Sequence, residues 1–501
     1  MELADSVMHF STKDKLVACL DEEIIQKHHQ ELLRHLPSFL DSRTINECQK
    51  LLSLFFYSKE SRKNLEKELK MYLVAVLEKC LDYESDKDKV KKIIELRHRM
   101  HAVVKIETFK AYRQLIKLVD DQFKNFITDK KLELNIVKYF HSFISKVKWS
   151  SGQEMKEFYC EVSDITSLVN EKTLFTIHYV KYLQKRLINY EDNRGLLYEN
   201  KILDNLKFQG FQEFSRKAEI PIKDLRTSFS LNSQFDSFYY SDYYKRDLYT
   251  FEKIKNVTFT FKVLTSDFWN TGEEVNVKLP KVISRMQSAY ETFFQSKFKE
   301  RKLKWKTELG KASINFKLGE GMRRKELVMT KLQALICLLF NQNSRLTFQQ
   351  LMGELGLKKP QTLQTELKGL LFSKVIVSSN AEKVKDELRS DSIFSVNTKF
   401  SNKRNLIKIK TFKYVEQDQK EEKTSEKAFI ISKKIKINSC LMKIMKSSKK
   451  VRFDILMNKA ILMLSEFFTP QRREILKGIE ELINKEFLAR DEEFPNILHY
   501  T

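Results

Sequence analysis

The first 151 residues contain no glycine and a single proline, Pro37. Helix interiors exclude these two residue types most strongly, so a stretch of this length without them predicts an almost entirely helical segment. Because neighbouring helices must cover the apolar stripes of such a segment, residues 1–150 are predicted to form a rod of stacked helices. One stripe, with its members mostly three and four positions apart, comprises Leu65, Leu69, Tyr72, Leu73, Val76 and Cys80.

The composition narrows the class of protein and of site. The chain has 501 residues, of which 42% are hydrophobic, enough for several buried cores. It contains neither a run of 18 apolar residues nor the basic and then apolar pattern of a signal peptide, so we expect no membrane partner and a location in the cytoplasm and nucleus. Nine scattered histidines and six cysteines without a Cys-x-x-Cys pair predict no metal site and no cofactor.

The pattern changes about halfway along the chain. Residues 151–255 are again helical, but Val257–Leu264 alternates in polarity and is rich in β-branched and aromatic residues, which predicts a strand. We therefore predict an α/β domain over residues 256–415. Within it, residues 327–379 follow the order helix, helix, helix, strand, which is typical of a winged helix.

The C-terminal part of the chain contains a polar segment and a second module. Phe394–Phe400 and Leu406–Ile409 are predicted strands of the α/β domain. Residues 411–427 are polar and charged, which predicts a flexible linker. Residues 428–501 then repeat the winged-helix order of helices and strands.

The first helix of this second module is strongly basic. Residues 433–452 include eight Lys or Arg and no carboxylate. At helical spacing, Lys443, Lys446 and Lys450 share one face, while the opposite face is apolar and would pack into a core. A basic face in solvent is the ordinary explanation of such a pattern. The apolar face comprises Ile437, Leu441, Ile444 and Met445.

The order of residues in this helix resembles a known family. Leu441-Met442-Lys443-Ile444-Met445-Lys446 is similar to the Ile-Val-Arg-Ile-Met-Lys segment of the cullins, the scaffold subunits of RING ubiquitin ligases. Arg301-Lys302-Leu303-Lys304-Trp305 is similar to the family's Arg-Lys-Leu-x-Trp, and Leu264-Thr265 with Trp269 to its Val-Leu-Thr-x-x-x-Trp. The resemblance is most specific from residue 257 onward.

The resemblance implies a mainly α fold. It consists of a helical cullin-repeat rod over residues 1–150, a four-helix bundle over 151–255, and then the α/β domain with two winged-helix modules. The predicted strands after residue 393 would return to the α/β sheet. The rod would hold part of a second repeat and a third, so that the chain is short at its N-terminus and lacks the first repeat. Whether it binds a substrate adaptor is therefore left open.

The resemblance also implies the functional residues. Lys446 would carry a ubiquitin-like modifier through an isopeptide bond, with Lys443, Lys449 and Lys450 as flanking recognition residues. The positive face would attract the acidic surface of a ubiquitin-conjugating enzyme. The α/β domain would pair with a strand of a RING-box zinc protein through main-chain hydrogen bonds. The candidate contacts for that protein are Trp269, Leu303 and Trp305, for which core packing is the other explanation.

Two alternative functions follow from the same residues. Tandem winged helices and a net charge of +24 suggest nucleic-acid binding. The last recognition helix argues against this function, because it carries as many Glu as Lys and Arg, whereas phosphate binding needs a basic surface. A truncated cullin that sequesters the RING subunit without recruiting substrate is the second alternative. The chain has no catalytic motif of a recognised kind, so a scaffold without enzymatic activity is the main prediction. The last recognition helix, on which the nucleic-acid alternative depends, carries four basic and four acidic residues: Arg472, Arg473, Lys477 and Lys485, and Glu474, Glu480, Glu481 and Glu486.

Overall fold

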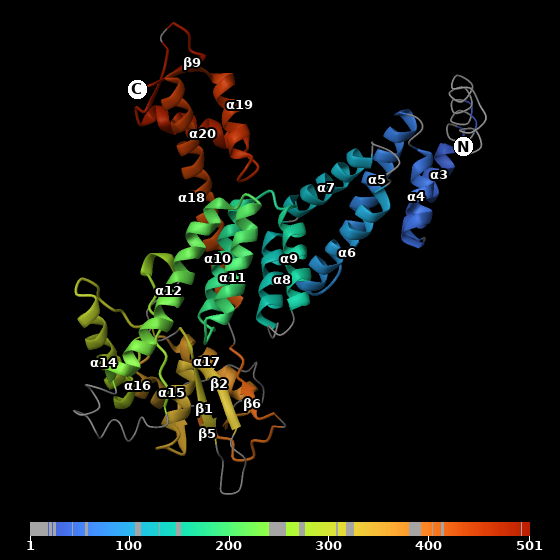
Figure 1. Ribbon diagram of the computed structural model, residues 1–501. Helices are drawn as coiled ribbons and strands as arrows, with labels where there is room; N and C mark the ends of the chain where they lie inside the picture. The colour runs from blue at the N-terminus through green and yellow to red at the C-terminus, as the bar shows by residue number, and fades with distance from the viewer. Residues whose placement is uncertain are drawn as a thin grey trace. The chain divides into compact units, whose positions relative to one another are not determined.

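The computed structural model is mainly helical, which confirms the predicted fold class (Figure 1). Its residues group into two compact units, one of Met1–Tyr182, Ile202–Phe214 and Ala428–Thr501, the other of Leu183–Lys201 and Ser215–Lys427. The structure describes residues 19, 23, 27–42, 44–55, 59–105, 112–129, 131–146, 152–239, 257–269, 276–306, 309–316, 325–379, 392–402, 404–411, 415–491 and 493–501.

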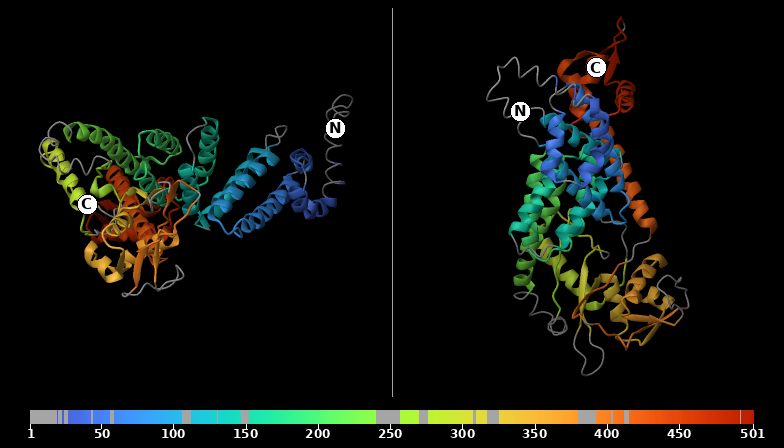
Figure 2. Two further views of the ribbon diagram at one scale, coloured as in Figure 1. Left: turned by 90° about the horizontal axis from the view of Figure 1, so that it is seen from below. Right: turned by 90° about the vertical axis from the view of Figure 1, so that its right-hand side faces the viewer.

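The N-terminal helices form a stacked array. Each helix from α3 to α6 contacts the helix two positions further along the chain, in the pairs α3 with α5, α4 with α6, α5 with α7 and α6 with α8 (Figure 2). Thr44 begins α4 with a capping box that includes Glu47. The helices are α3 Lys27–Ser42, α4 Ile45–Leu54, α5 Lys59–Lys79, α6 Asp86–Val104, α7 Tyr112–Asp129 and α8 Glu133–Lys146.

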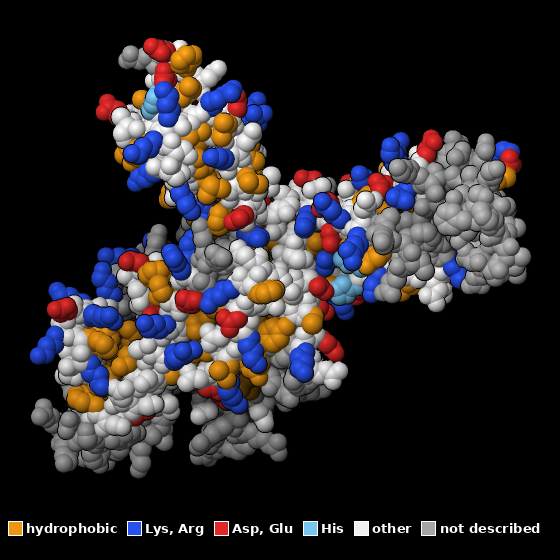
Figure 3. Space-filling view, turned by 45° about the horizontal axis from the view of Figure 1, so that its top comes forward, with side chains coloured by type: hydrophobic (Ala, Val, Ile, Leu, Met, Phe, Trp, Pro, Cys, Tyr) orange, Lys and Arg blue, Asp and Glu red, His pale blue; other side chains and the backbone are white. Residues whose placement is uncertain are grey.

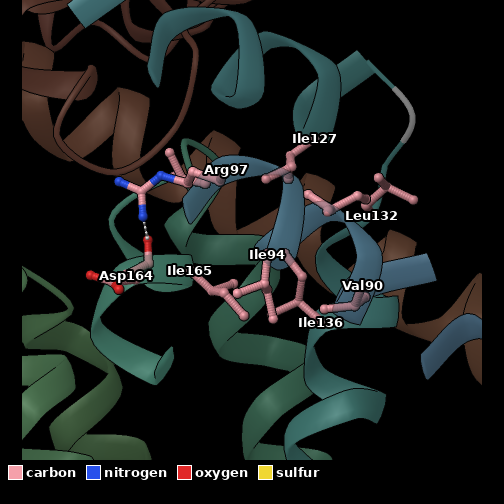
Figure 4. Close-up of a pocket in the computed structure, with 10 residues that line it drawn as sticks. Val90, Ile94, Arg97, Ile127, Leu132, Ile136, Asp164 and Ile165 are labelled. Atoms are coloured by element: carbon pink, nitrogen blue, oxygen red, sulfur yellow. Dashed lines mark hydrogen bonds between the residues drawn. The ribbon is translucent and has the colours of Figure 1, made fainter. Parts of the chain in front are cut away.

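A small cavity lies between α6, α7, α8 and α9 (Gly152–Thr166). Figure 4 shows mainly apolar side chains pointing into it, with Arg97 at its edge. The guanidinium donates hydrogen bonds to the Asp164 carbonyl and to the Asp120 carboxylate, both at 3.1 Å. With a volume of about 20 Å³ and an apolar lining, the cavity is a packing void.

Four helices follow in the segment predicted as a bundle: α9, α10 Lys172–Leu187, α11 Arg194–Phe208 and α12 Gln212–Phe238. A buried ion pair joins α10 to α11, with Arg186 Nε 2.6 Å and Nη2 3.0 Å from the Glu199 carboxylate. Tyr190 donates a further hydrogen bond to Glu199 at 2.7 Å. A buried carboxylate needs such partners, because its removal from water costs free energy.

The α/β domain contains a three-stranded sheet and the inserted winged helix. The sheet order is β1-β2-β6, with β1 antiparallel and β6 parallel to β2, and Leu327 pairs with Ile314 and Ile407. A buried apolar core, which includes Leu327, Ile336 and Leu367, joins this sheet to the winged helix. The elements are η3 Ser266–Phe268, α14 Lys281–Lys297, β1 Lys311–Phe316, β2 Lys325–Thr330, α15 Lys331–Leu339, β3 Arg345–Thr347, α16 Phe348–Leu355, α17 Pro360–Phe372, β4 Ile376–Ser378, β5 Ile393–Val396 and β6 Leu406–Lys408.

The strand assignments in this domain need two corrections. The strand β5 does not return to the α/β sheet as predicted, because it lies between β3 and β4 and completes the winged helix, which therefore extends beyond residue 379. Residues 257–264, predicted as a strand, pair with no other strand in the described part of the chain. Side chains of α12 bond their backbone instead, as set out below.

The C-terminal module has the winged-helix order, with a sheet in the order β7-β9-β8. Its first helix corrects the predicted linker: α18 already begins at Val415, so residues 415–427 are helical. The segment 411–427 contains neither Gly nor Pro and is rich in Glu, Gln and Lys, which are good helix formers. The elements are α18 Val415–Ser448, β7 Lys450–Arg452, α19 Phe453–Leu464, α20 Arg472–Asn484, β8 Leu488–Arg490 and β9 Ile497–Tyr500.

None of the helices in the described ranges is both long and apolar enough to cross a membrane. Within the same ranges, no three His, Cys, Asp or Glu side chains come together in a way that would hold a metal ion.

Candidate functional site

Lys446 lies on the exposed side of α18, two residues before that helix ends at Ser448. The opposite side of the helix anchors it, because Ile437, Leu441, Ile444 and Met445 are all at most 5% exposed in the core of the C-terminal module. The periodicity of the sequence predicts this division. The amine is therefore carried by a packed helix and remains accessible to a partner.

The end of α18 is determined by a single residue with a left-handed backbone. Lys449 has φ of 52°, and its N–H donates to the Met445 carbonyl at 2.8 Å. This conformation closes the helix, since a left-handed residue is the usual helix terminator. The Lys449 carbonyl in turn accepts the N–H of Tyr500 at 2.8 Å, which places the last strand beside the helix end. The Lys446 ammonium lies over the Tyr500 ring, with Nζ 5.9 Å from the ring centroid.

Asp491 organises the wing next to this helix end. Its carboxylate is 2.6 Å from Lys450 Nζ and 2.8 Å from His499 Nε2, and it accepts the backbone N–H groups of Glu493 and Phe494. The Lys450 ammonium, followed by the other donors, holds the pKa of Asp491 well below its usual range. Lys450 and His499 are also partners in the β7–β9 pairing.

The three flanking lysines thus have different roles in the structure. Lys443 is exposed on α18 beside Lys446. Lys449 supplies the backbone turn that ends the helix. Lys450 makes an ion pair with Asp491 and belongs to the wing rather than to a free cationic face. Of the basic face expected from the sequence, Lys443 and Lys446 are the two lysines that lie exposed on α18 itself.

The extended segment 257–264 is the second candidate site. Along one of its edges, Asn232 on α12 bonds both backbone groups of Phe261, and Ser228 accepts the N–H of Val263 at 2.8 Å. In extended backbone, alternate residues point their N–H and C=O groups to opposite edges. The N–H and C=O of Thr260 and Lys262 therefore point to the other edge, where no strand of the described chain pairs with them.

Other contacts anchor this segment without occupying that edge. Lys262 extends its ammonium to the carbonyls of Leu187, Ile188 and Tyr190, at 3.4, 2.5 and 2.6 Å, and so satisfies acceptors at the C-terminal end of α10. Burial lowers the pKa of Lys262 to about 8. Phe259, Phe261 and Val263 pack on the core formed by α12 and α14.

The three residues expected to contact a RING protein do not lie together. Leu303 and Trp305 pack on the α12–α14 core, and the Trp305 ring is 5.7 Å from that of Phe261 in an edge-to-face contact. Trp269 is 5% exposed and donates its indole N–H to Asp224 at 2.8 Å. The location of Trp269 is thus that of a core aromatic with its polar group satisfied.

Four residues of these sites were not identified from the sequence: Tyr500, Asp491, Asn232 and Ser228. A signal existed for the last two, because they are polar, four residues apart and lie on the same side of α12 as Leu225 and Phe235. Polar side chains on a buried helical face need partners. Asp491 and Tyr500 belong to an Arg-Asp…Tyr ending that resembles the C-terminus of the cullins, but the resemblance assigned them no role.

The nucleic-acid alternative gains no local support. In the recognition helix α20, Glu474 lies 3.4 Å from Lys433, and Glu481 makes an ion pair with Lys434. Lys and Arg side chains on the face shown in Figure 3 are spread among acidic ones instead of forming a single basic surface. Phosphate binding depends on a concentrated positive surface.

Comparison with known proteins covers most of the chain. Three family models match it: the Cullin alpha solenoid domain over residues 1–232, the Cullin alpha+beta domain over 263–400 and the Cullin protein neddylation domain over 432–493. The last of these contains Lys446.

Individual relatives agree with these matches. Cullin-4A of Mus musculus is 26% identical over 508 residues, covering 100% of this chain and 64% of the relative. Cullin-4A of Homo sapiens is 24% identical, covering 98% of the chain and 63% of the relative. Cullin-1 of Oryza sativa subsp. japonica is 24% identical, covering 98% and 67%. The chain thus spans about two thirds of the length of these proteins, and on this evidence it belongs to the cullin family.

Proposed function

We propose that this chain is the non-catalytic scaffold subunit of a multi-subunit RING ubiquitin ligase, and that a ubiquitin-like modifier is attached to Lys446. The observation that carries the proposal is the exposed Lys446 side chain on a helix whose other face is buried, within the segment that matches a neddylation domain. A packed helix holds the amine in place without enclosing it, which is what an acceptor for a large protein donor requires.

The chemistry at Lys446 is acyl transfer from a thioester on a conjugating enzyme. The ammonium first loses a proton to solvent, and the neutral Nζ attacks the carbonyl carbon of the modifier's C-terminal thioester. A C–N bond forms and the C–S bond breaks. The nitrogen keeps one proton in the new amide, and its other proton goes to the departing thiolate. The products are the isopeptide and the free thiol of the conjugating enzyme. The thioester and the catalysis belong to the partners.

For the RING-box protein, we propose that one of its strands adds to the free edge of residues 257–264. The Asn232 and Ser228 side chains occupy the opposite edge and hold the segment extended before a partner arrives. Such preorganisation lowers the entropic cost of strand addition. Leu303 and Trp305 lie next to this segment on the same core, whereas buried Trp269 serves packing.

Modification is proposed to act by shifting the position of the C-terminal module. Polar contacts among the described residues join this module to the beginning of α10: the Thr173 N–H donates to the Phe467 carbonyl at 3.2 Å, Lys436 Nζ is 2.5 Å from Thr173 Oγ1, and the Thr469 N–H donates to Glu171 at 3.1 Å. Hydrogen bonds of this kind are individually weak, so they suit a two-state equilibrium that an attached modifier biases, releasing the RING subunit to move.

The acceptor assignment is tested by a Lys446→Arg substitution. The full chain with a RING-box protein is incubated with a modifier-charged conjugating enzyme, and the attachment site is mapped by mass spectrometry. Arginine keeps the positive charge and lacks the nucleophilic amine, so we expect modification to disappear. Lys459→Arg, an exposed lysine on α19, is the matched control and should be modified as the wild type is. Modification of Lys446→Arg at the wild-type extent overturns the assignment.

The strand-addition site is tested by Thr260→Pro, which removes an N–H group from the free edge. We expect the variant to lose co-purification with the RING-box protein. Thr260→Val, which changes the side chain and keeps the N–H group, should retain it. Equal binding by both variants contradicts the proposed edge. Ubiquitin transfer that does not respond to modification, despite RING binding, would instead favour a sequestering role.

A further inference from the structure

The acceptor lysine has an aromatic neighbour that the family assignment leaves without a role. Lys446 Nζ lies 5.9 Å from the centroid of the Tyr500 ring, at the distance where a cation is attracted by the face of an aromatic ring. Tyr500 is partly buried against the core of the C-terminal module, so the ring cannot swing freely into solvent. The contact joins the last turn of α18 to the last strand of the chain.

The backbone holds Tyr500 at this position from two sides. Its N–H donates to the carbonyl of Lys449, the left-handed residue that closes α18, at 2.8 Å. On the other side, Tyr500 pairs with Leu488 in the β8–β9 ladder. The ring position is therefore determined by the same turn that ends the helix carrying Lys446.

The ammonium of Lys450, another lysine close to the end of α18, is held by the wing and not by Tyr500. Lys450 follows the helix end directly, but its ammonium is 2.6 Å from Asp491 and so is held in the wing. Asp491 also binds His499, the residue before Tyr500. Among the described residues, the cation that lies over the Tyr500 ring is the ammonium of Lys446.

From this geometry we propose that Tyr500 is a positioning residue for the modification of Lys446. A lysine side chain has a flexible four-carbon stem, whose many rotamers must be restricted before the amine can meet a thioester. The ring attracts the ammonium and confines it near the end of α18. Once the amine has lost its proton to solvent, the attraction between cation and ring ends and the neutral nitrogen is free to attack. The proposal rests on the proposed function, because it assumes that Lys446 is the acceptor.

The kinetic test compares two substitutions in the full chain with its RING-box protein. Tyr500→Leu removes the aromatic face, and Tyr500→Phe keeps it. In single-turnover transfer from a modifier-charged conjugating enzyme, we expect Leu to lower the saturating rate about 2- to 5-fold, without changing the enzyme concentration that gives half the maximal rate. Phe should restore the wild-type rate. Phe494→Leu removes an exposed aromatic ring of the wing, outside the β8–β9 ladder, and is the matched control.

A spectroscopic readout tests the contact without any conjugation. In the full chain carrying ¹³C-labelled lysine, the Lys446 methylene resonances, assigned with Lys446→Arg, should be shifted upfield by the ring current in the wild type and in Tyr500→Phe. Tyr500→Leu should lose this shift while its thermal unfolding remains that of the control. Equal lysine resonances and equal transfer rates in Tyr500→Leu and the wild type would overturn the positioning role.

The two proposals fail in different ways. If Lys446→Arg is still modified at the wild-type extent, the proposed acceptor is wrong, whatever the resonances show. If modification requires Lys446 but Tyr500→Leu transfers at the wild-type rate, the acceptor stands and the positioning role is excluded. A slower Tyr500→Leu that Phe does not rescue also excludes it, because the defect then does not depend on an aromatic face.

Discussion

Asn232 bonds both backbone groups of Phe261: its Oδ1 accepts the Phe261 N–H at 2.9 Å, and its Nδ2 donates to the Phe261 carbonyl at 2.7 Å. One side-chain amide on α12 thus makes the two hydrogen bonds that a neighbouring strand would make. This relationship explains how the backbone of Phe261 is satisfied without belonging to a sheet. The opposite edge of the segment pairs with no strand among the described residues.

The first prediction concerns this amide. Asn232→Leu should lower the free energy of unfolding by about 1–3 kcal/mol, because the N–H and C=O of Phe261 lose their partners in a half-buried location. It should also weaken binding of the RING-box protein, since the segment is no longer held extended. Urea denaturation and a binding titration measure the two effects. Ser237→Ala, at an exposed position of the same helix, is the control, and unchanged stability in Asn232→Leu would contradict the assigned role.

A second prediction concerns the buried pair of α10 and α11. Both Arg186 and Glu199 are at most 2% exposed, and the guanidinium meets the carboxylate at 2.6 and 3.0 Å. Glu199→Ala removes the carboxylate that accepts two hydrogen bonds from the buried guanidinium, so we expect a loss of about 3–5 kcal/mol in the free energy of unfolding. Asp204→Ala, at an exposed carboxylate of α11, should change it by less than about 0.5 kcal/mol. Chemical denaturation of the three proteins checks the difference.

Glu133 at the start of α8 predicts a dependence of stability on pH. This residue is fully buried, and burial, reinforced by the nearby Glu171 carboxylate, raises its pKa from 4.5 to about 7. Between these two values the folded state keeps the proton that the unfolded state releases. Stability is therefore highest below about pH 4.5 for this group, falls as pH rises toward 7 and is level above it, by about 3 kcal/mol in total.

Glu133→Gln should remove this contribution, because the amide does not titrate. Urea denaturation at pH 5 and at pH 8 then gives a smaller difference for the variant than for the wild type. Glu95→Gln, at an exposed residue of α6, should retain the wild-type difference. If Glu133→Gln and the wild type respond to pH equally, the carboxyl does not titrate in this window.

The wing around Asp491 carries a final prediction. The Lys450 ammonium lowers the pKa of Asp491, so the stabilisation is present above the ordinary pKa of aspartate and is lost as pH falls through the lowered value. Asp491→Asn should loosen the β7–β9 pairing and speed hydrogen exchange at the Tyr500 amide, which bonds the Lys449 carbonyl. Asp454→Asn, at an exposed carboxylate of α19, is the matched variant. An unchanged exchange rate at Tyr500 in Asp491→Asn would show that the carboxylate does not hold the strand.

Residues 411–427 and 257–264 show what the local sequence pattern predicts and what it does not. Residues 411–427 are polar and charged, which predicted a linker, but the absence of Gly and Pro leaves nothing to stop α18 from beginning at Val415. The alternation in residues 257–264 correctly groups Phe259, Phe261 and Val263, which all pack on the core formed by α12 and α14. It carries no information about which group bonds the backbone, and here that group is a set of side chains on α12.

By itself the sequence determined the helical class, the buried face of α18 and the exposure of Lys446, because each depends on spacing within one helix. The tertiary structure alone decided that Asn232 substitutes for a strand, that Asp491 engages Lys450, and that Tyr500 lies beneath Lys446. These relationships join residues that are distant along the chain. Packing of helices and pairing of strands bring them together, and no local periodicity records the result.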